Sequence, residues 1–202
     1  MSSSPVLVLD IDGVIVHSAP DWPDKLQGTF GLSADHLVRG FFDSAPFAQV
    51  LQGRLDVYVA LHEWLEPQGL ADRLQEFVSF WFENDSTVDR EVLAMADDWR
   101  GRTGGRVFAA SNQEHHRVVF LRDHLGLGAH FDEIVYSAAL GVCKPDRIFF
   151  TNAQARMAVT AARAILFVDD RPANVDAARM CGWRAALYRG RESLARVLAN
   201  VE

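Results

Sequence analysis

The sequence predicts an α/β fold in which a doubly wound parallel β-sheet carries helices on both faces and an α-helical insert follows the first strand. Short, continuous aliphatic runs recur along the chain, as expected for strands that are buried on both faces. From about residue 88 onward these runs alternate with helical patterns, which is the order of βαβ units. Between residues 14 and 87 only helical patterns occur, so an insert separates the first strand from the second.

The expected strands share a short apolar run. They are Val6–Leu9, Arg106–Ala110, Glu133–Tyr136, Ala164–Val168 and the weaker Arg184–Tyr188. Helical patterns that connect the later strands cover Gln113–Leu125, Asp146–Met157 and Ala173–Cys181. The first and last of these are followed by glycine (Gly126 and Gly182), the residue most often found just beyond a helix C-terminus.

The insert shows its own helix signals. The expected helices run from a Ser33 N-cap to Phe42, over Asp56–Leu65 and Leu70–Phe82 as an antiparallel pair joined by Glu-Pro-Gln-Gly, and over Glu91–Trp99 back to the sheet. The chain therefore divides into a discontinuous α/β core (residues 1–13 and 88–202) and a helical domain (residues 14–87).

Composition narrows the class of protein. Hydrophobic residues make up 49% and charged residues 23% of the 202 residues, as in soluble globular proteins. A net charge of −7 disfavours a nucleic-acid partner and means that any phosphate site needs local cations. Cys143 and Cys181 do not form a disulfide framework. With neither a signal peptide nor a membrane segment recognisable, a cytoplasmic location is expected.

Two aspartates interrupt the end of the first apolar run. Asp10 and Asp12 are two residues apart, so along an extended chain both side chains point the same way, with Cα atoms about 6.5–7 Å apart. Ligands of open α/β sheets bind at this edge of the sheet. Gly13 lets the chain turn away and lets a ligand approach the backbone. Two carboxylates this close require a cation between them or a proton on one of them.

Polar side chains also follow three later strands. Ser111 and Asn112 precede a helix, whose N-terminal amides form an anion site. Lys144 lies before Pro145, which keeps it out of helical geometry and starts the next helix. The acidic pair Asp169–Asp170 suits a hard cation such as Mg²⁺. Each feature alone has an ordinary structural explanation, but together, at one edge of one sheet, they describe a magnesium site that handles a phosphoryl group.

These residues form a set of four motifs that resembles the haloacid dehalogenase-like (HAD) hydrolase superfamily. The motifs appear in order as Asp-Ile-Asp-Gly-Val (10–14), Ala-Ser-Asn (110–112), Cys-Lys-Pro-Asp (143–146) and Phe-Val-Asp-Asp-Arg-Pro-Ala-Asn (167–174). The insert resembles the helical cap that one subgroup of the family places after the first motif, although the cap itself matches only loosely, at Gln52–Arg54.

The resemblance implies a Rossmann-like core and a Mg²⁺-dependent phosphatase that hydrolyses a small phosphate monoester through an aspartyl-phosphate intermediate. Asp10 would be the nucleophile, and Asp12 would protonate the leaving oxygen. Lys144 would neutralise the nucleophile and the phosphate. The metal would contact Asp10, the backbone carbonyl of Asp12 and Asp170, with Asp169 supporting it from behind. Ser111 and Asn112 would hold phosphate oxygens.

Asp12 also separates reactions within the family, because halide release needs no proton and the dehalogenase members are expected to lack this second aspartate. A phosphomutase with the same core remains an alternative, as does a non-catalytic binding protein on this fold. A phospho-receiver domain would be shorter and uninterrupted. The cap is expected to select a small phosphometabolite, such as a sugar or nucleotide monophosphate, through His17, Arg39, Arg54 or its aromatic side chains.

Other polar residues near the motifs have less certain assignments. Asn174 follows the last acidic pair and is expected to orient Asp170 or Lys144, or to cap a helix. The pair His115–His116 begins a helix and either faces the phosphate or forms an exposed first turn.

Overall fold

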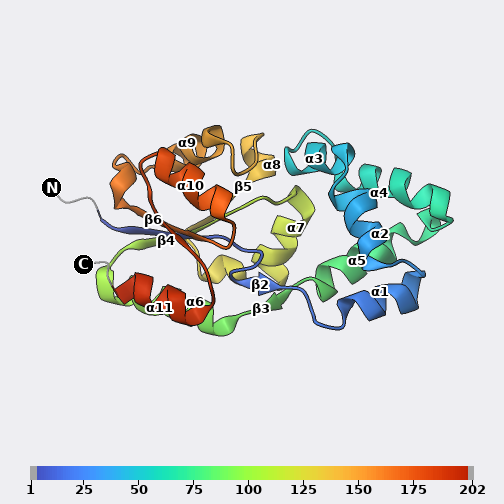
Figure 1. Ribbon diagram of the computed structural model, residues 1–202, viewed down its shortest axis with the longest axis horizontal. Coiled ribbons are helices and arrows are strands. Elements are labelled where there is room, and N and C mark those ends of the chain that lie inside the picture. The colour runs from blue at the N-terminus through green and yellow to red at the C-terminus, as the bar shows by residue number, and fades with distance from the viewer. Residues whose placement is uncertain (1–3, 200–202) are drawn as a thin grey trace.

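The computed structural model describes residues 4–199 and shows a five-stranded parallel sheet in the order β5-β4-β1-β6-β7 (Figure 1). The strands are β1 (Val6–Leu9), β4 (Arg106–Ser111), β5 (Glu133–Tyr136), β6 (Ile165–Asp169) and β7 (Arg184–Leu187). The chain moves from the central β1 to one side through β4 and β5, and then to the other side through β6 and β7. The predicted doubly wound α/β fold and its five strands are confirmed. The expectation that the N-terminus is not a signal peptide rests partly on residues 1–3, which lie outside the described residues.

Helices cover both faces of the sheet, and β1 shows why its residues are all apolar. Leu7 and Leu9 pack on the face covered by α6 (Arg90–Thr103) and α11 (Arg191–Ala199). Val6 and Val8 point to the opposite face, where α9 (Arg147–Arg156) and α10 (Pro172–Met180) lie (Figure 1). Successive strand residues alternate between faces, so a strand covered on both sides needs an apolar residue at every position.

The segment between β1 and β4 forms a separate helical body with its own hydrophobic core, on the right in Figure 1. Its helices are α1 (Trp22–Phe30), α2 (Ala34–Leu37), the π-helical turn η1 (Val38–Phe42), α3 (Ala45–Leu51), α4 (Val57–Leu65) and α5 (Leu74–Asn84). Ser33 caps α2, as expected, by accepting a hydrogen bond from the backbone N–H of His36. These features agree with a helical insert, whereas the boundaries at residues 14 and 87 stay a prediction.

The sequence analysis expected only helices in the insert, and this was wrong at its base. A short antiparallel pair, β2 (Val16–His17) with β3 (Thr87–Val88), joins the two crossings of the chain between core and insert. Strands of two residues are too short to show a recognisable period. The helices α1, α3, α8 (Ser137–Leu140) and α11 were also not predicted.

Several element limits differ from the expected ones. The helix expected over Gln113–Leu125 consists of α7 (His115–Val119) and the π-helical turn η4 (Phe120–His124). Pro145 does not start a helix, because α9 begins at Arg147 and Asp146 caps it through the backbone N–H of Ile148. The 3₁₀ turns are η2 (Glu66–Gln68), η3 (Ala71–Arg73), η5 (Leu127–Ala129) and η6 (Ala162–Ala164).

Two expectations about cellular context can be compared with the structure. Across residues 4–199, no helix has both the length and the apolar character that crossing a membrane requires. Cys143 and Cys181 are both free thiols.

Candidate active site

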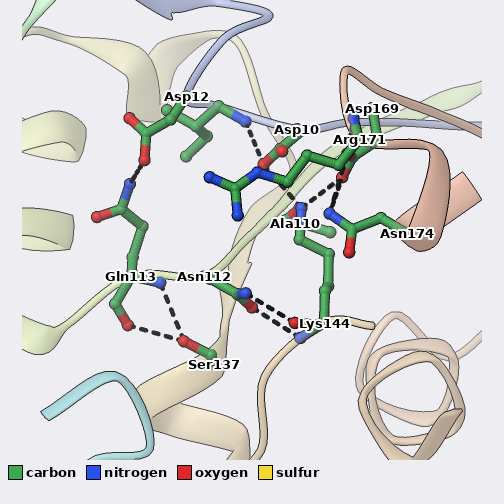
Figure 2. Close-up of polar contacts among 11 residues, drawn as sticks. Asp10, Asp12, Ala110, Asn112, Gln113, Ser137, Lys144, Asp169, Arg171 and Asn174 are labelled. Carbon is green, nitrogen blue, oxygen red and sulfur yellow. Dashed lines mark hydrogen bonds and ion pairs between the residues drawn. The ribbon is translucent and has the colours of Figure 1, made fainter. Parts of the chain in front are cut away.

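A cavity of about 600 Å³ lies between the carboxyl edge of the sheet and the helical insert. Its floor comes from the core and contains Asp10, Asp12, Ser111, Asn112 and Lys144. These residues follow β1, β4 and β5, so the topology brings together positions more than a hundred residues apart in the sequence (Figure 2). The cavity occupies the edge at which open α/β sheets bind their ligands.

Three carboxylates converge beside this floor. Asp10, Asp169 and Asp170 each offer one oxygen within 4.8 Å of the others. Gly13 makes this approach possible, because a Cβ atom at this position would lie 2.4 Å from Oδ2 of Asp170. Its φ angle of +80° also favours glycine. The sequence analysis expected Gly13 to let a ligand approach the backbone, and the structure shows that the carboxylate of Asp170 takes that space.

Lys144 joins the ends of β1, β4 and β6. Its ammonium group lies 2.8 Å from Oδ1 of Asp10 and 2.7 Å from Oδ2 of Asp169, and it donates to the carbonyl oxygen of Ala110 at 2.9 Å (Figure 2). The Lys144 side chain is 1% exposed. These contacts account for all three protons of the ammonium group, so Lys144 is held rigidly beside Asp10.

The electrostatics around Asp10 favour a bound cation. Burial raises the pKa of Asp10 to about 7; Lys144 lowers this pKa and Asp169 raises it. Burial lowers the pKa of Lys144, but Asp10 and Asp169 outweigh it and hold this pKa above its ordinary value. Both directions follow from the same imbalance, because one ammonium group faces two carboxylates. A divalent cation beside Asp10 would favour the charged carboxylate at neutral pH.

The donor set fits Mg²⁺. All the converging groups are oxygens, and the carboxylates outnumber the ammonium group beside them. Burial also raises the pKa of Asp170, with Asp169 adding to the shift and Arg171 opposing it. A hard divalent cation with oxygen ligands would relieve this excess of negative charge.

Asp169 is completely buried and its oxygens are occupied by protein donors. Besides Lys144, it accepts hydrogen bonds from Nδ2 of Asn174 at 2.9 and 3.0 Å and from the backbone N–H of Arg171 at 2.8 Å. The sequence analysis expected Asn174 to orient Asp170 or Lys144, or to cap a helix. Its side chain instead orients Asp169.

Asp12 is held by two residues that the sequence analysis missed. Nε2 of Gln113 donates to Oδ2 of Asp12 at 2.5 Å (Figure 2), and a guanidinium nitrogen of Arg117 lies 3.7 Å from its Oδ1. The Asp12 side chain is 51% exposed because it faces the cavity. Burial within the surrounding protein nevertheless raises the pKa of Asp12, partly offset by Arg117 and reinforced by Asp85.

Arg117 is itself a buried residue of the core that links Asp12 to the insert. Its guanidinium lies 3.5 Å from Oδ2 of Asp85 and packs over the rings of Trp81 and Phe82. Asp85 follows α5 and also accepts hydrogen bonds from Ser18 and from Nε1 of Trp81. No motif marks Arg117 in the sequence; the one available signal is its place one helical turn after Gln113.

Ser111 and Asn112 both line the cavity, but their side chains are placed differently. The hydroxyl of Ser111 has no hydrogen-bond partner within residues 4–199 and remains available to a ligand. The amide of Asn112 instead bonds the backbone of Lys144, donating to its carbonyl oxygen at 2.9 Å and accepting from its N–H at 2.7 Å. We therefore correct the expectation that the Asn112 side chain holds phosphate oxygens: it positions Lys144.

The anion site expected at the start of the following helix is also corrected. The helix begins at His115, and the side chain of Glu114 caps it by accepting from the backbone N–H groups of His116 and Arg117. A carboxylate therefore already occupies these donors. His115 contacts the Tyr136 hydroxyl and His116 pairs with Asp56 across the junction with the insert, so neither histidine lines the cavity.

Arg171 is a further cavity residue without an assigned role in the sequence analysis, although it lies inside the last motif. Figure 2 shows its side chain extending across the site toward the space between Asp10 and Asp12. Within residues 4–199 its guanidinium has no hydrogen-bond or ion-pair partner.

The insert closes the cavity from the opposite side. We call the apolar side chains that it contributes the cavity roof, which consists of Val38, Phe42, Phe47, Leu51 and Trp81. His17 also lines the cavity, as expected for a substrate-facing residue. Arg39 and Arg54 do not, and Arg39 pairs with Asp35 on the outside.

The loop around Gly53 brings the insert onto the core. Its φ angle is +67°, and a Cβ atom there would lie 2.4 Å from the carbonyl oxygen of Ala138. The loose match at Gln52–Arg54 therefore marks a contact with the core, because only a residue without a side chain permits this approach.

The comparisons agree with this fold and site. Residues 5–182 match the model of the haloacid dehalogenase-like hydrolase family, and the chain belongs to that family. No curated protein matches the chain in sequence.

Solved structures share the fold over nearly the whole chain. A predicted HAD-like family hydrolase from Porphyromonas gingivalis has a TM-score of 0.79 at 20% identity, covering 99% of this chain and 100% of its own. The HAD family enzyme BT-2542 from Bacteroides thetaiotaomicron, in complex with magnesium and inorganic phosphate, has a TM-score of 0.78 at 15% identity, covering 96% and 99%. L-2-haloacid dehalogenase from Xanthobacter autotrophicus, with chloropropionic acid covalently bound, has a TM-score of 0.69 at 18% identity, covering 98% and 83%.

Proposed function

We propose that this HAD hydrolase is a Mg²⁺-dependent phosphatase that hydrolyses a small phosphate monoester through an aspartyl phosphate on Asp10. The observation that carries the proposal is the placement of Asp12, which faces the cavity beside Asp10 and is held by Gln113 and Arg117. Cleavage of a P–O bond leaves an alkoxide that needs a proton, whereas cleavage of a carbon–halogen bond releases a halide that needs none.

In the first step, a carboxylate oxygen of Asp10 attacks phosphorus, and the bond from phosphorus to the alcohol oxygen breaks. The protein contacts of Asp10 within residues 4–199, from Lys144 and the backbone N–H of Ile11, are both made to Oδ1, so Oδ2 is left for the ligand or the metal. Asp12 donates its proton to the departing oxygen, which leaves as a neutral alcohol. The raised pKa of Asp12 favours the protonated form that this step requires.

In the second step, Asp12, now a carboxylate, takes a proton from water, and the water oxygen attacks phosphorus. The bond between Asp10 and phosphorus breaks, inorganic phosphate leaves, and Asp12 is protonated again. Gln113 and Arg117 keep the Asp12 carboxyl group in the cavity through both proton transfers. Covalent catalysis of this kind replaces one difficult displacement by two easier ones.

Phosphate binding falls to groups of the core. Lys144, the Ser111 hydroxyl and the Arg171 guanidinium supply positive charge and a hydroxyl donor toward the space in front of Asp10. A bound Mg²⁺, held by Asp10, Asp170 and the backbone carbonyl of Asp12, with Asp169 behind, would neutralise charge on the transferring phosphoryl group. Without these cations the carboxylate of Asp10 would face a phosphate dianion.

The dehalogenase relatives make carbon–halogen cleavage the main competing activity, and a phosphomutase or a non-catalytic protein remains possible on the same fold. The test is a panel of phosphate esters and 2-haloacids assayed with Mg²⁺ for released phosphate, isomerised product or halide. We expect inorganic phosphate from the esters and no halide. Halide release, or transfer of the phosphoryl group within the substrate, would refute the proposal. A cytoplasmic location and a lack of nucleic-acid partners are part of the same proposal.

A further inference from the structure

We infer that the alcohol part of the substrate is uncharged and apolar, such as an aryl or alkyl group. This inference rests on the proposed phosphatase function and narrows its substrate class. It differs from the sugar or nucleotide monophosphate that the sequence analysis expected. The argument depends on what the insert presents to the cavity, because the core floor binds the phosphoryl group and the opposite side must meet the alcohol.

The insert presents a continuous apolar surface. The cavity roof consists of aliphatic and aromatic side chains, and Trp81 and Phe47 also belong to the hydrophobic core of the insert. Val38 is 41% exposed although it is aliphatic and lines an enclosed cavity. Apolar surface of this kind gains free energy when a ligand removes it from water.

A π-helical turn places part of this surface. In η1, the backbone N–H of Asp43 bonds the carbonyl oxygen of Val38 at 2.8 Å, a spacing of five residues. Phe41 packs into the core of the insert, whereas Val38, Phe42 and Asp43 line the cavity. Turns of this type occur frequently at functional sites, because the wider turn redirects side chains that an α-helix would place elsewhere.

The charges around the cavity oppose a second acidic group on the substrate. The cavity-lining cations, Lys144, Arg117 and Arg171, all come from the core. Lys144 and Arg117 are already paired with carboxylates, and Arg171 reaches the phosphoryl side (Figure 2). Among the described residues, no lysine or arginine of the insert lines the cavity.

The charged groups that the insert does bring to the cavity are carboxylates. Asp85 is paired with Arg117, while Asp43 is exposed and has no ion-pair partner in the part of the chain that the structure describes. A carboxylate or second phosphate on the alcohol would lie near Asp43 without a cation to offset the repulsion.

A sugar is disfavoured for a different reason. Hydroxyl groups that leave water need hydrogen-bond partners, and the cavity roof offers only the indole N–H of Trp81, which already donates to Asp85. The polar side chains next to the roof are also engaged, since Ser18 donates to Asp85 and Gln113 donates to Asp12. His17 and Asp43 are too few to satisfy the several hydroxyls of a sugar ring.

The test compares phosphate esters of primary alcohols, whose leaving groups have similar basicity. The panel contains 2-phenylethyl phosphate, hexyl phosphate, glucose 6-phosphate, phosphoglycolate and phosphocholine, with 4-nitrophenyl phosphate to detect phosphatase activity itself. We expect kcat/KM to be about 10-fold or more higher for the first two esters, which is the scale on which an apolar pocket discriminates.

Two variants locate the effect. Val38→Ser should raise KM for hexyl phosphate several-fold, whereas Val59→Ser, which changes a 48% exposed valine of α4 outside the cavity, should not. Asp43→Lys should increase kcat/KM for phosphoglycolate relative to hexyl phosphate, and Asp43→Asn should do so less. Thermal unfolding of each variant checks that it is folded.

The outcomes separate this inference from the proposed function. If no ester is hydrolysed, 4-nitrophenyl phosphate included, both are refuted. If esters are hydrolysed but glucose 6-phosphate, phosphoglycolate or phosphocholine is preferred, the phosphatase stands and the inference fails. Equal effects of Val38→Ser and Val59→Ser on hexyl phosphate would also overturn it.

Discussion

Replacing Gly13 by alanine should disable the metal site while leaving the fold intact. Gly13 has a φ angle of +80°, and its missing Cβ leaves room for Oδ2 of Asp170. Gly126 offers a matched control in the core, because its φ angle is +76° but a Cβ atom there would meet nothing within 4 Å. Both Gly→Ala variants carry the same backbone penalty, about 1–2 kcal/mol for a left-handed non-glycine residue.

The size of the effect follows from the contact distance. The added Cβ would lie 2.4 Å from Oδ2 of Asp170, and ordinary contact begins at 3.4 Å, so the carboxylate must move by about 1 Å. Mg²⁺ holds its ligands at about 2.0–2.1 Å and tolerates only small departures from this distance. A misplacement of about 1 Å costs roughly 10²-fold in rate, and we expect a decrease of that order in kcat/KM for Gly13→Ala at limiting Mg²⁺.

The assay combines activity with a measurement that needs no turnover. Phosphate release is titrated against Mg²⁺ for the wild type, Gly13→Ala and Gly126→Ala, and thermal unfolding is recorded with and without Mg²⁺. Mg²⁺ should raise the unfolding temperature of the wild type and of Gly126→Ala, but much less that of Gly13→Ala, since a ligand stabilises only the state that binds it. An unchanged Mg²⁺ titration in Gly13→Ala would show that Asp170 is not a metal ligand.

Three further predictions concern the same site. Asp12→Asn should lower kcat by about 10²–10⁴-fold with alkyl phosphates and far less with 4-nitrophenyl phosphate, which needs little protonation; a defect of equal size with both esters would contradict its role as acid. Lys144→Ala should weaken inhibition by inorganic phosphate and destabilise the fold by about 3–5 kcal/mol, because it leaves Asp10 and Asp169 as buried carboxylates without their ammonium partner; unchanged phosphate inhibition would leave Lys144 a structural role only. Exhaustive chelation should abolish phosphate release and added Mg²⁺ should restore it, since Asp10, Asp169 and Asp170 crowd negative charge; full activity after chelation would refute the metal requirement.

The strands of the core could be predicted because each is apolar at nearly every position. Strands such as β1 and β6 are buried on both faces, so their patterns require no knowledge of the neighbouring strands. The pair β2 and β3 could not be predicted, because each strand has two residues and forms only when the chain crosses between core and insert twice.

The main acidic and basic residues of the site could also be predicted. Asp10, Lys144 and Asp169 follow apolar strands, and the parallel topology brings such positions to one edge. Their hydrogen-bond partners could not be predicted in the same way. Asn112 was expected to hold phosphate, but its amide bonds the backbone of Lys144, which is 32 residues away in the sequence.

By itself, the sequence determined the α/β class, the order of the motifs and the residue types at the carboxyl ends of the strands, because these depend on local burial and on parallel topology. Only the tertiary structure decided which groups touch. Gln113 and Arg117 reach Asp12 across more than a hundred residues, and the cavity roof lies over the floor because the insert closes on the core at Gly53. Such contacts arise from the packing of two bodies, and no short stretch of sequence encodes the distance between them.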